Sequence, residues 1–87
     1  MNEQAMTSTE DRIRSYIISR YPVLEAKGLG NDDSLAGVLD SLAVVGLIGF
    51  IEPEFSIELS ASDLTDENFE TVTAISQLVE RLKGPGR

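Results

Sequence analysis

The residues best suited to chemistry are Asp40 and Ser41, which stand immediately before a run of apolar residues. A serine where a helix begins lies beside backbone N–H groups that have no intrahelical partner, and the positive end of the helix dipole favours a phosphate there. Serine catalysis needs a base and a group that orients it, but the chain has no histidine, and Lys27 and Lys83 form no recognisable Ser–Lys arrangement. Ser41 is therefore better suited to being modified than to catalysing a reaction.

Other site chemistries fail on residue type. With neither cysteine nor histidine, the usual ligands of zinc, haem and iron–sulfur clusters are missing. A calcium loop starting at Asn31 would have Leu35, Ala36 and Leu42 where an oxygen ligand, a glycine and a glutamate are needed. The segment Gly28-Leu29-Gly30 follows no predicted strand, and the chain lacks a Gly-Lys-Ser/Thr motif. We expect no metal site, no nucleotide site and no enzymatic activity.

The charge distribution indicates the kind of partner. The net charge is −8, and the interval from Gly28 to Glu80 holds eleven acidic residues and no lysine or arginine. Such a field repels nucleic acids and anionic membranes and attracts basic protein surfaces. A merely solubilising face would show the same acids, but the absence of bases around Ser41 in the sequence favours a docking surface.

Length and hydropathy set further limits. Eighty-seven residues without cysteine predict one small domain with a plain hydrophobic core. The longest apolar stretch, Leu42 to Ile51, is about half of the ~20 residues that a membrane-spanning helix needs. The segment Met1 to Met6 has neither the basic nor the apolar region of a signal peptide. We therefore expect a monomeric protein of the cytoplasm that does not bind membranes.

Helical spacing and stop signals predict the elements. Pro22 ends the first helix, Pro53 ends or distorts the second, Ser60 caps a short one, and the sequence Gly84-Pro85-Gly86 stops the last. The predicted helices cover about residues 9–21, 41–51, 60–64 and 71–83. No segment alternates as a strand would. The fold class is thus all-α: a small bundle of three main helices and one short helix, with a long loop between the first two main helices. We expect residues 1–87 to form a single domain that is structured over about 8–83 and has flexible termini.

Apolar residues in the long loop and the second main helix predict the core. In the loop, the anchoring residues are Val23, Leu24, Leu35, Val38 and Leu39. In the helix, the residues expected to face the core are Leu47, Ile48, Ile51 and Phe55. Gly46 and Gly49 each cost roughly 1 kcal/mol in a helix interior, so something must compensate for them. Either a neighbouring segment packs closely there or a partner approaches the backbone, and we prefer the partner.

A pattern across nearly the whole domain resembles the acyl carrier protein family, the phosphopantetheine-dependent carriers. The matching segments are Gly37-Val38-Leu39-Asp40-Ser41-Leu42, Val45, Leu47, Ile51-Glu52-x-Glu54-Phe55-x-Ile57-x-Leu59, Asp63-Leu64 and Phe69-x-Thr71-Val72-x-x-Ile75. Asp-Ser-Leu alone is a weak signal, because an acid–serine pair before a helix is often only a cap. The downstream spacing makes the resemblance specific.

The resemblance implies that Ser41 carries 4′-phosphopantetheine, transferred from coenzyme A by a phosphopantetheinyl transferase, with Asp40 assisting the modification. The thiol of this arm would hold an acyl or aminoacyl group as a thioester. The implied partners are the transferase, an acyl- or aminoacyl-loading ligase and downstream synthase enzymes with basic docking surfaces. The positions implied for partner binding are Leu42, Val45, Gly46, Gly49 and Glu52.

The sequence also departs from the family pattern. Gly46, Gly49 and Pro53 stand where fatty-acid-type carriers often have acidic or polar residues, which leaves the partner face more apolar. We expect a discrete acyl carrier of a fatty-acid-like or specialised, polyketide-like pathway. One alternative is an aminoacyl or peptidyl carrier loaded by an adenylating ligase. Another is an acidic helical interaction module that is never modified and binds a partner helix through a groove at Val44, Val45 and Gly49.

Overall fold

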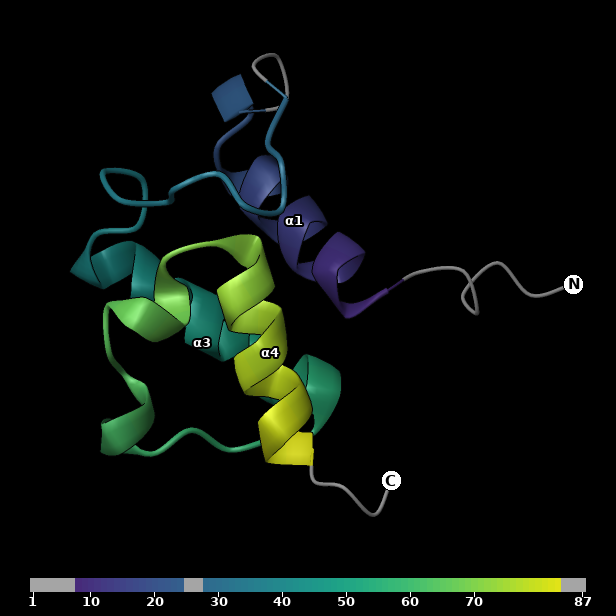
Figure 1. The fold of residues 1–87 in the computed structure, drawn as a ribbon, viewed down its shortest axis with the longest axis vertical. Helices are drawn as coiled ribbons and strands as arrows, with labels where there is room; N and C mark the ends of the chain where they lie inside the picture. Colours follow the sequence, from purple (N-terminus) through teal and green to yellow (C-terminus); the bar gives the residue numbers. More distant parts are fainter. Residues whose placement is uncertain (1–7, 25–27, 84–87) are drawn as a thin grey trace, which may run out of the picture.

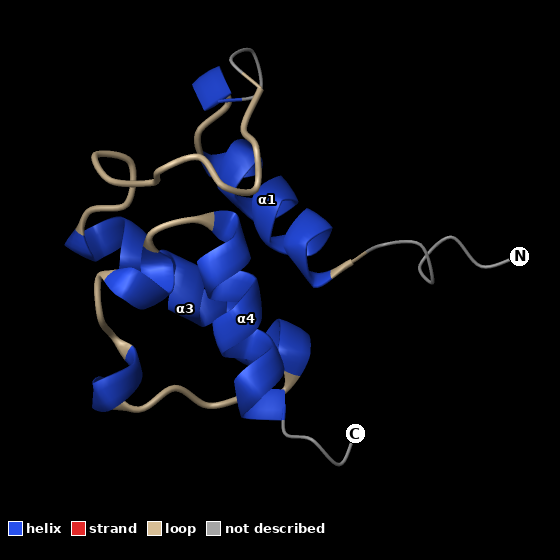
Figure 2. Ribbon diagram, in the orientation of Figure 1, coloured by secondary structure: helices blue, strands red, loops and turns tan. Residues whose placement is uncertain are grey.

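The computed structural model describes residues 8–24 and 28–83, and within these ranges every regular element is helical (Figures 1 and 2). The elements in chain order are α1 (Thr9–Arg20), α3 (Ser41–Phe55), the 3-10 turns η2 (Ala61–Asp63) and η3 (Glu67–Phe69), and α4 (Val72–Lys83). The predicted all-α class, with a long connection between the first two main helices, is confirmed. No helix in the described ranges has both the length and the hydropathy needed to cross a bilayer.

Helix α1 begins and ends where its local signals predict. The Ser8 side chain accepts a hydrogen bond from the backbone N–H of Asp11 at 3.0 Å, and Glu10 and Asp11 lie in the first turn, where the helix dipole favours acids. The Tyr21 N–H closes the last turn on the carbonyl of Ile17. Capping and charge thus define both ends of this helix.

The core forms where α1, α3 and α4 meet. Each of the three helices contacts the other two, and α1 and α4 pack against each other most extensively. The fully buried side chains are Ile13, Ile17, Leu35, Leu47, Ile51, Val72, Ile75, Leu78 and Val79. The predicted core positions of α3 are confirmed at Leu47, Ile51 and Phe55. Ile48 is only partly buried, because its side of α3 faces a cavity rather than α1 and α4.

The loop before α3 is held against the start of α4 by two backbone hydrogen bonds. The Leu35 N–H donates to the Glu70 carbonyl at 2.8 Å, and the Thr73 N–H donates to the Asn31 carbonyl at 3.0 Å. Arg14 of α1 donates to the Asn31 side chain. The bond from Thr73 to Asn31 satisfies one of the N–H groups that the first turn of a helix leaves free.

Three of the five predicted loop anchors are confirmed, and Val38 is half-buried. Leu35 is fully buried, and Leu24 and Leu39 pack against the core. Val23 is 63% exposed, so its prediction as an anchor is wrong. Val23 and Leu24 lie in one helical turn, in which Val23 faces solvent and Leu24 packs against the core.

The predicted end of α3 near Ile51 is also wrong, since the helix continues through Pro53 to Phe55. Pro53 removes one backbone hydrogen bond. Phe55 offsets that loss because its ring is only 7% exposed and lies under the Arg12 guanidinium, 4.9 Å from the ring centroid. Ser56 then ends the helix in the left-handed conformation, with φ 57°.

The two glycines of α3 have different surroundings. A Cβ atom at Gly46 would lie 3.1 Å from the hydroxyl of Tyr16, whose ring stacks on Phe50 with centroids 4.5 Å apart. At Gly49 a Cβ atom would meet nothing within 4 Å. The segment that approaches Gly46 closely is therefore α1 of the same chain, which is the alternative that we did not prefer.

The helices predicted for the C-terminal third are confirmed in part. Asp63 accepts the Ser60 N–H at 2.9 Å, which confirms the short capped helix at η2, while η3 was not predicted. Helix α4 begins at Val72, one residue after the predicted start. The expected flexible termini and the stop at Gly84-Pro85-Gly86 lie outside the described residues.

The two glycines give the first prediction. Gly49→Ala removes a helix-interior glycine without creating a contact, so it should stabilise the fold by about 1 kcal/mol. Gly46→Ala should give less than half of this gain, because the new methyl group must displace the stacked Tyr16. Urea unfolding followed by circular dichroism measures both. Equal stabilisation by the two substitutions would contradict the packing at Gly46.

Candidate functional site

Ser41 is the first residue of α3, and its side chain is exposed. The helix is capped by Asp40, whose carboxylate accepts the Ala43 N–H at 2.8 Å and whose carbonyl accepts the Val44 N–H at 2.9 Å. Among the described residues, no acceptor serves the N–H groups of Ser41 and Leu42, and the Ser41 hydroxyl has no hydrogen-bond partner. The hydroxyl and two backbone donors thus lie together at the positive end of the helix.

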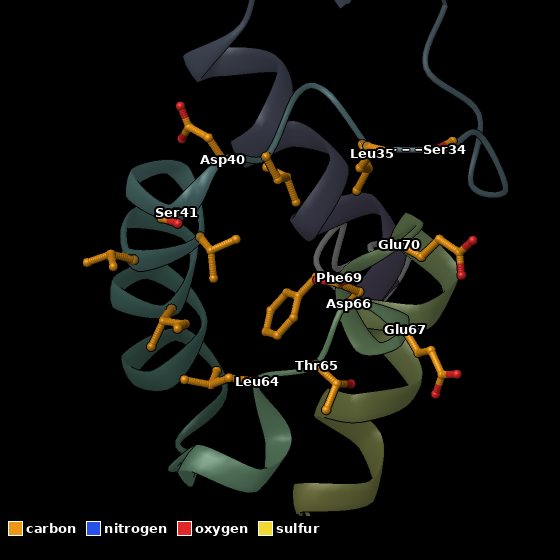
Figure 3. Close-up of a pocket in the computed structure, with 15 residues that line it drawn as sticks. Ser34, Leu35, Asp40, Ser41, Leu64, Thr65, Asp66, Glu67, Phe69 and Glu70 are labelled. Atoms are coloured by element: carbon orange, nitrogen blue, oxygen red, sulfur yellow. Dashed lines mark hydrogen bonds between the residues drawn. The ribbon is translucent and has the colours of Figure 1, made fainter.

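A cavity of about 700 Å³ lies beside Ser41 (Figure 3). One wall is α3, with Ser41, Val44, Val45 and Ile48, and the loop residues Leu35 and Leu39 continue it. Phe69 and Leu64 come from the opposite wall, and Figure 3 shows the Phe69 ring projecting toward α3. The Phe69 side chain is only 7% exposed, so it forms part of the cavity floor as well as of the core.

All charged residues that line this cavity are acidic. They are Asp40, Asp66, Glu67 and Glu70, and the lining includes no lysine or arginine. Each of the four is exposed, and Figure 3 shows the Glu67 and Glu70 side chains pointing away from the cavity, so apolar side chains form its interior. An apolar interior suits a guest that is largely apolar.

The outer face of α3 exposes large apolar side chains. Leu42 is 79% exposed and Val45 is 64% exposed, and Gly49 on the same helix is also exposed. A small hollow beside Leu42 is lined in part by Gly46 and by Arg20 of α1. Arg20 of α1 therefore lies at the hollow beside Leu42, although no lysine or arginine is close to Ser41 along the sequence.

Glu52, predicted for partner binding, has a structural role in the chain. Its carboxylate accepts the Leu59 N–H at 2.9 Å in a partly buried position, and its carbonyl accepts the Ile57 N–H at 3.0 Å. Glu52 thus holds the segment that leaves α3. Its neighbour Glu54 forms an ion pair with Arg12, so both acids are occupied by contacts within the chain.

Most of the cavity residues were missed as site residues from the sequence, and Leu64 and Phe69 are examples. Leu64 and Phe69 were quoted only as part of the family pattern, although both line the cavity opposite Ser41. Their only local signal was apolar character among acids, at Asp63-Leu64 and at Asn68-Phe69-Glu70. In residues 8–24 and 28–83, no three carboxylates gather closely enough to hold a metal ion.

Comparison with known proteins supports a carrier. The D-alanyl carrier proteins of Streptococcus pyogenes serotype M5 (strain Manfredo) and serotype M1 are each 46% identical to this chain over 48 residues. The match covers 55% of this chain and 61% of each relative, so the chain spans about three-fifths of the length of the curated relatives that it matches. No protein-family model matches the chain. The similarity confirms the predicted resemblance to the acyl-carrier-type family, whose members carry groups and are not themselves enzymes.

The cap geometry gives the second prediction. Asp40→Ala removes the acceptor for the Ala43 N–H and should destabilise the fold by about 1 kcal/mol. Asp40→Asn keeps a capping oxygen and should stay within a few tenths of a kcal/mol of the wild type. Urea unfolding of the two variants tests the assignment, and an equal loss in both would show that the charge of Asp40, rather than its cap, stabilises α3.

Proposed function

We propose that this chain is a discrete acyl carrier protein that holds its cargo on a 4′-phosphopantetheine arm attached to Ser41. The observation that carries the proposal is the free, exposed hydroxyl of Ser41 at the start of α3, next to a cap supplied by Asp40. The resemblance to D-alanyl carrier proteins supports the same conclusion independently of this geometry.

The residues around Ser41 fit a phosphodiester. The Ser41 oxygen is accessible, and the free N–H groups of Ser41 and Leu42 would donate to phosphate oxygens at the positive end of α3. The Asp40 carboxylate is already held by the Ala43 N–H, which fixes its direction beside the serine and suits it to assist the transferase. When bound, the arm would supply a terminal thiol that holds the cargo as a thioester.

The loading step follows from the chemistry of the serine. The Ser41 oxygen would form a bond to the pantetheine-bearing phosphorus of coenzyme A, and the bond from that phosphorus to the bridging oxygen of the diphosphate would break. Adenosine 3′,5′-bisphosphate would leave, and the hydroxyl proton would pass to a base. Among the described residues, Ser41 has no base bonded to it, so the transferase must supply one.

For the cargo, we propose an acyl intermediate of a fatty-acid-like or specialised pathway. An aminoacyl cargo, loaded by an adenylating ligase, is the second candidate, because the relatives are named as carriers of a D-alanyl group. The same arm on Ser41 would serve either cargo. The thioester-forming enzyme therefore decides between the two.

For the partners, we propose enzymes that dock on the start of α3. These are the transferase, the loading ligase and downstream synthase enzymes, working in the cytoplasm. Leu42 and Val45 are the exposed apolar contacts, and Gly49 leaves space for a partner side chain beside the helix. Gly46 and Glu52 border the same face, but each is also engaged within the chain.

The direct test is the intact mass of the protein after incubation with coenzyme A, magnesium and a broad-specificity phosphopantetheinyl transferase. We expect one added phosphopantetheine on the wild type and none on Ser41→Ala, since this substitution removes the attacking oxygen. Circular dichroism of the variant checks that it is folded. A folded wild type that gains no mass would contradict the carrier function and favour the unmodified interaction module.

The docking surface gives a separate prediction. Leu42→Ala should raise the KM of the transferase about tenfold and change the free energy of unfolding little, because Leu42 is 79% exposed. Val23→Ala is the matched control, since Val23 is 63% exposed and lines neither the cavity nor the hollow beside Leu42. Equal KM values for the two variants would exclude Leu42 as a docking contact.

A further inference from the structure

The hollow beside Leu42 and the cavity beside Ser41 lie on different faces of α3. The α3 residues that line the hollow are Leu42, Ala43 and Gly46, and none of them lines the cavity. The two faces also differ in charge. Among the described residues, Arg20 of α1 is the one charged residue that lines the hollow, whereas every charged residue of the cavity is acidic. The start of α3 therefore has a base on the side that faces α1.

Aromatic packing holds Arg20 at this hollow. The guanidinium carbon lies over the Tyr16 ring, 5.9 Å from its centroid, and the Tyr16 ring stacks on Phe50. A cation over an aromatic face is attracted by the electrons of the ring. Gly46 leaves room for this arrangement, because a Cβ atom there would lie 3.1 Å from the Tyr16 hydroxyl. Contacts within the chain thus orient Arg20 before any partner arrives.

Arg20 has no acidic partner in the part of the chain that the structure describes. The ion pairs there use Arg12, Arg14 and Lys83, and Arg81 donates to an asparagine side chain. Arg20 is exposed, and its guanidinium donates no hydrogen bond to a described residue. In a protein with a net charge of −8, this arginine is available to an acid that comes from outside the described chain.

The size and the donors of the hollow fit one carboxylate. Its volume is about 30 Å³, and one water needs roughly 10–15 Å³ of such space, so the hollow holds about two oxygen-sized atoms. The fork of an arginine matches the two oxygens of a carboxylate, and Tyr16, which also lines the hollow, has a hydroxyl that can donate. An acyl chain or a nucleotide is too large for this space.

We propose that this hollow receives an aspartate or glutamate side chain of the enzymes that act on Ser41, of which the transferase is the first. The inference rests on the proposed function, since an enzyme that reaches Ser41 also covers the start of α3. It adds a requirement on the partner, namely one carboxylate that faces α1, next to an apolar site for Leu42, in a surface that is otherwise basic. This pair fixes the orientation of the partner, because a rotated partner would place a base against Arg20.

The first experiment measures modification by the broad-specificity transferase in ~20 mM salt, where charges are least screened. Arg20→Glu should raise KM about fivefold and leave kcat within about twofold, because an attraction becomes a repulsion away from the reacting oxygen. Arg20→Lys keeps the charge and should stay within about twofold in KM. A wholly basic partner surface would give the opposite sign, since Arg20→Glu would then lower KM.

The matched control is Arg81→Glu, which makes the same change of charge at an exposed arginine of α4 that does not line the hollow. Its KM should not rise. Circular dichroism checks every variant, because Arg20 also lies in the last turn of α1, where the helix dipole favours a base.

The second experiment identifies the carboxylate. A water-soluble carbodiimide joins an amine to a carboxylate with which it is paired, so Arg20→Lys provides an amine for coupling. Mass spectrometry of the digested complex should find position 20 joined to an aspartate or glutamate of the transferase. If Arg20→Glu did not fold, this crosslink would decide alone.

An unchanged or lowered KM for folded Arg20→Glu would overturn the proposal, and so would an equal rise for Arg81→Glu or the absence of a crosslink at position 20. A folded wild type that gains no phosphopantetheine would refute the carrier function itself. The two failures are therefore distinguishable by the mass of the wild type.

Discussion

The structure depends on two backbone hydrogen bonds between segments far apart in the sequence. The Leu35 N–H donates to the Glu70 carbonyl, and the Thr73 N–H donates to the Asn31 carbonyl. The first segment leads into Ser41 and the second leads into α4, so these bonds fix the two walls of the cavity relative to each other. Without them the loop would have only its apolar anchors and the hydrogen bond from Arg14 to the Asn31 side chain, and a loop of this length orders poorly unless it is held at several points.

The two segments joined by these hydrogen bonds also explain how a small chain maintains an open cavity. Leu35 of the loop and Phe69 of the opposite wall both belong to the core, so the core holds both of these segments in place. Two of the basic residues, Arg12 and Lys83, lie over the Phe55 ring at the far end of α3. The Thr9 hydroxyl donates to Glu80 at 2.6 Å and lowers the pKa of that carboxyl, which joins α1 to α4 at a site separate from the cavity.

Local sequence signals predicted the helices, whereas long-range contacts determined the end of α3 and the cavity beside Ser41. Helical spacing was sufficient to place α1 and α4, because amphipathicity and capping act within a few residues. The end of α3 was misplaced because the burial of Phe55 outweighs Pro53. At the site, Ser41 and Asp40 were predicted, but the cavity was not, since its walls come from segments that only the fold brings together.

Asp40 caps α3 while the Ser41 hydroxyl stays free, and this difference in role links the fold to the proposed function. An acid–serine pair before a helix is ambiguous in sequence, because either residue can serve as the cap. Had Ser41 capped α3, its oxygen would be committed to a backbone N–H and shielded from a modifying enzyme. In the structure Asp40 accepts the Ala43 N–H instead, which leaves Ser41 ordered by the helix but chemically free. A serine that must receive a covalent group has to be held in position while its hydroxyl stays free. The Asp40 carboxylate, one residue before Ser41, provides both conditions by capping the helix.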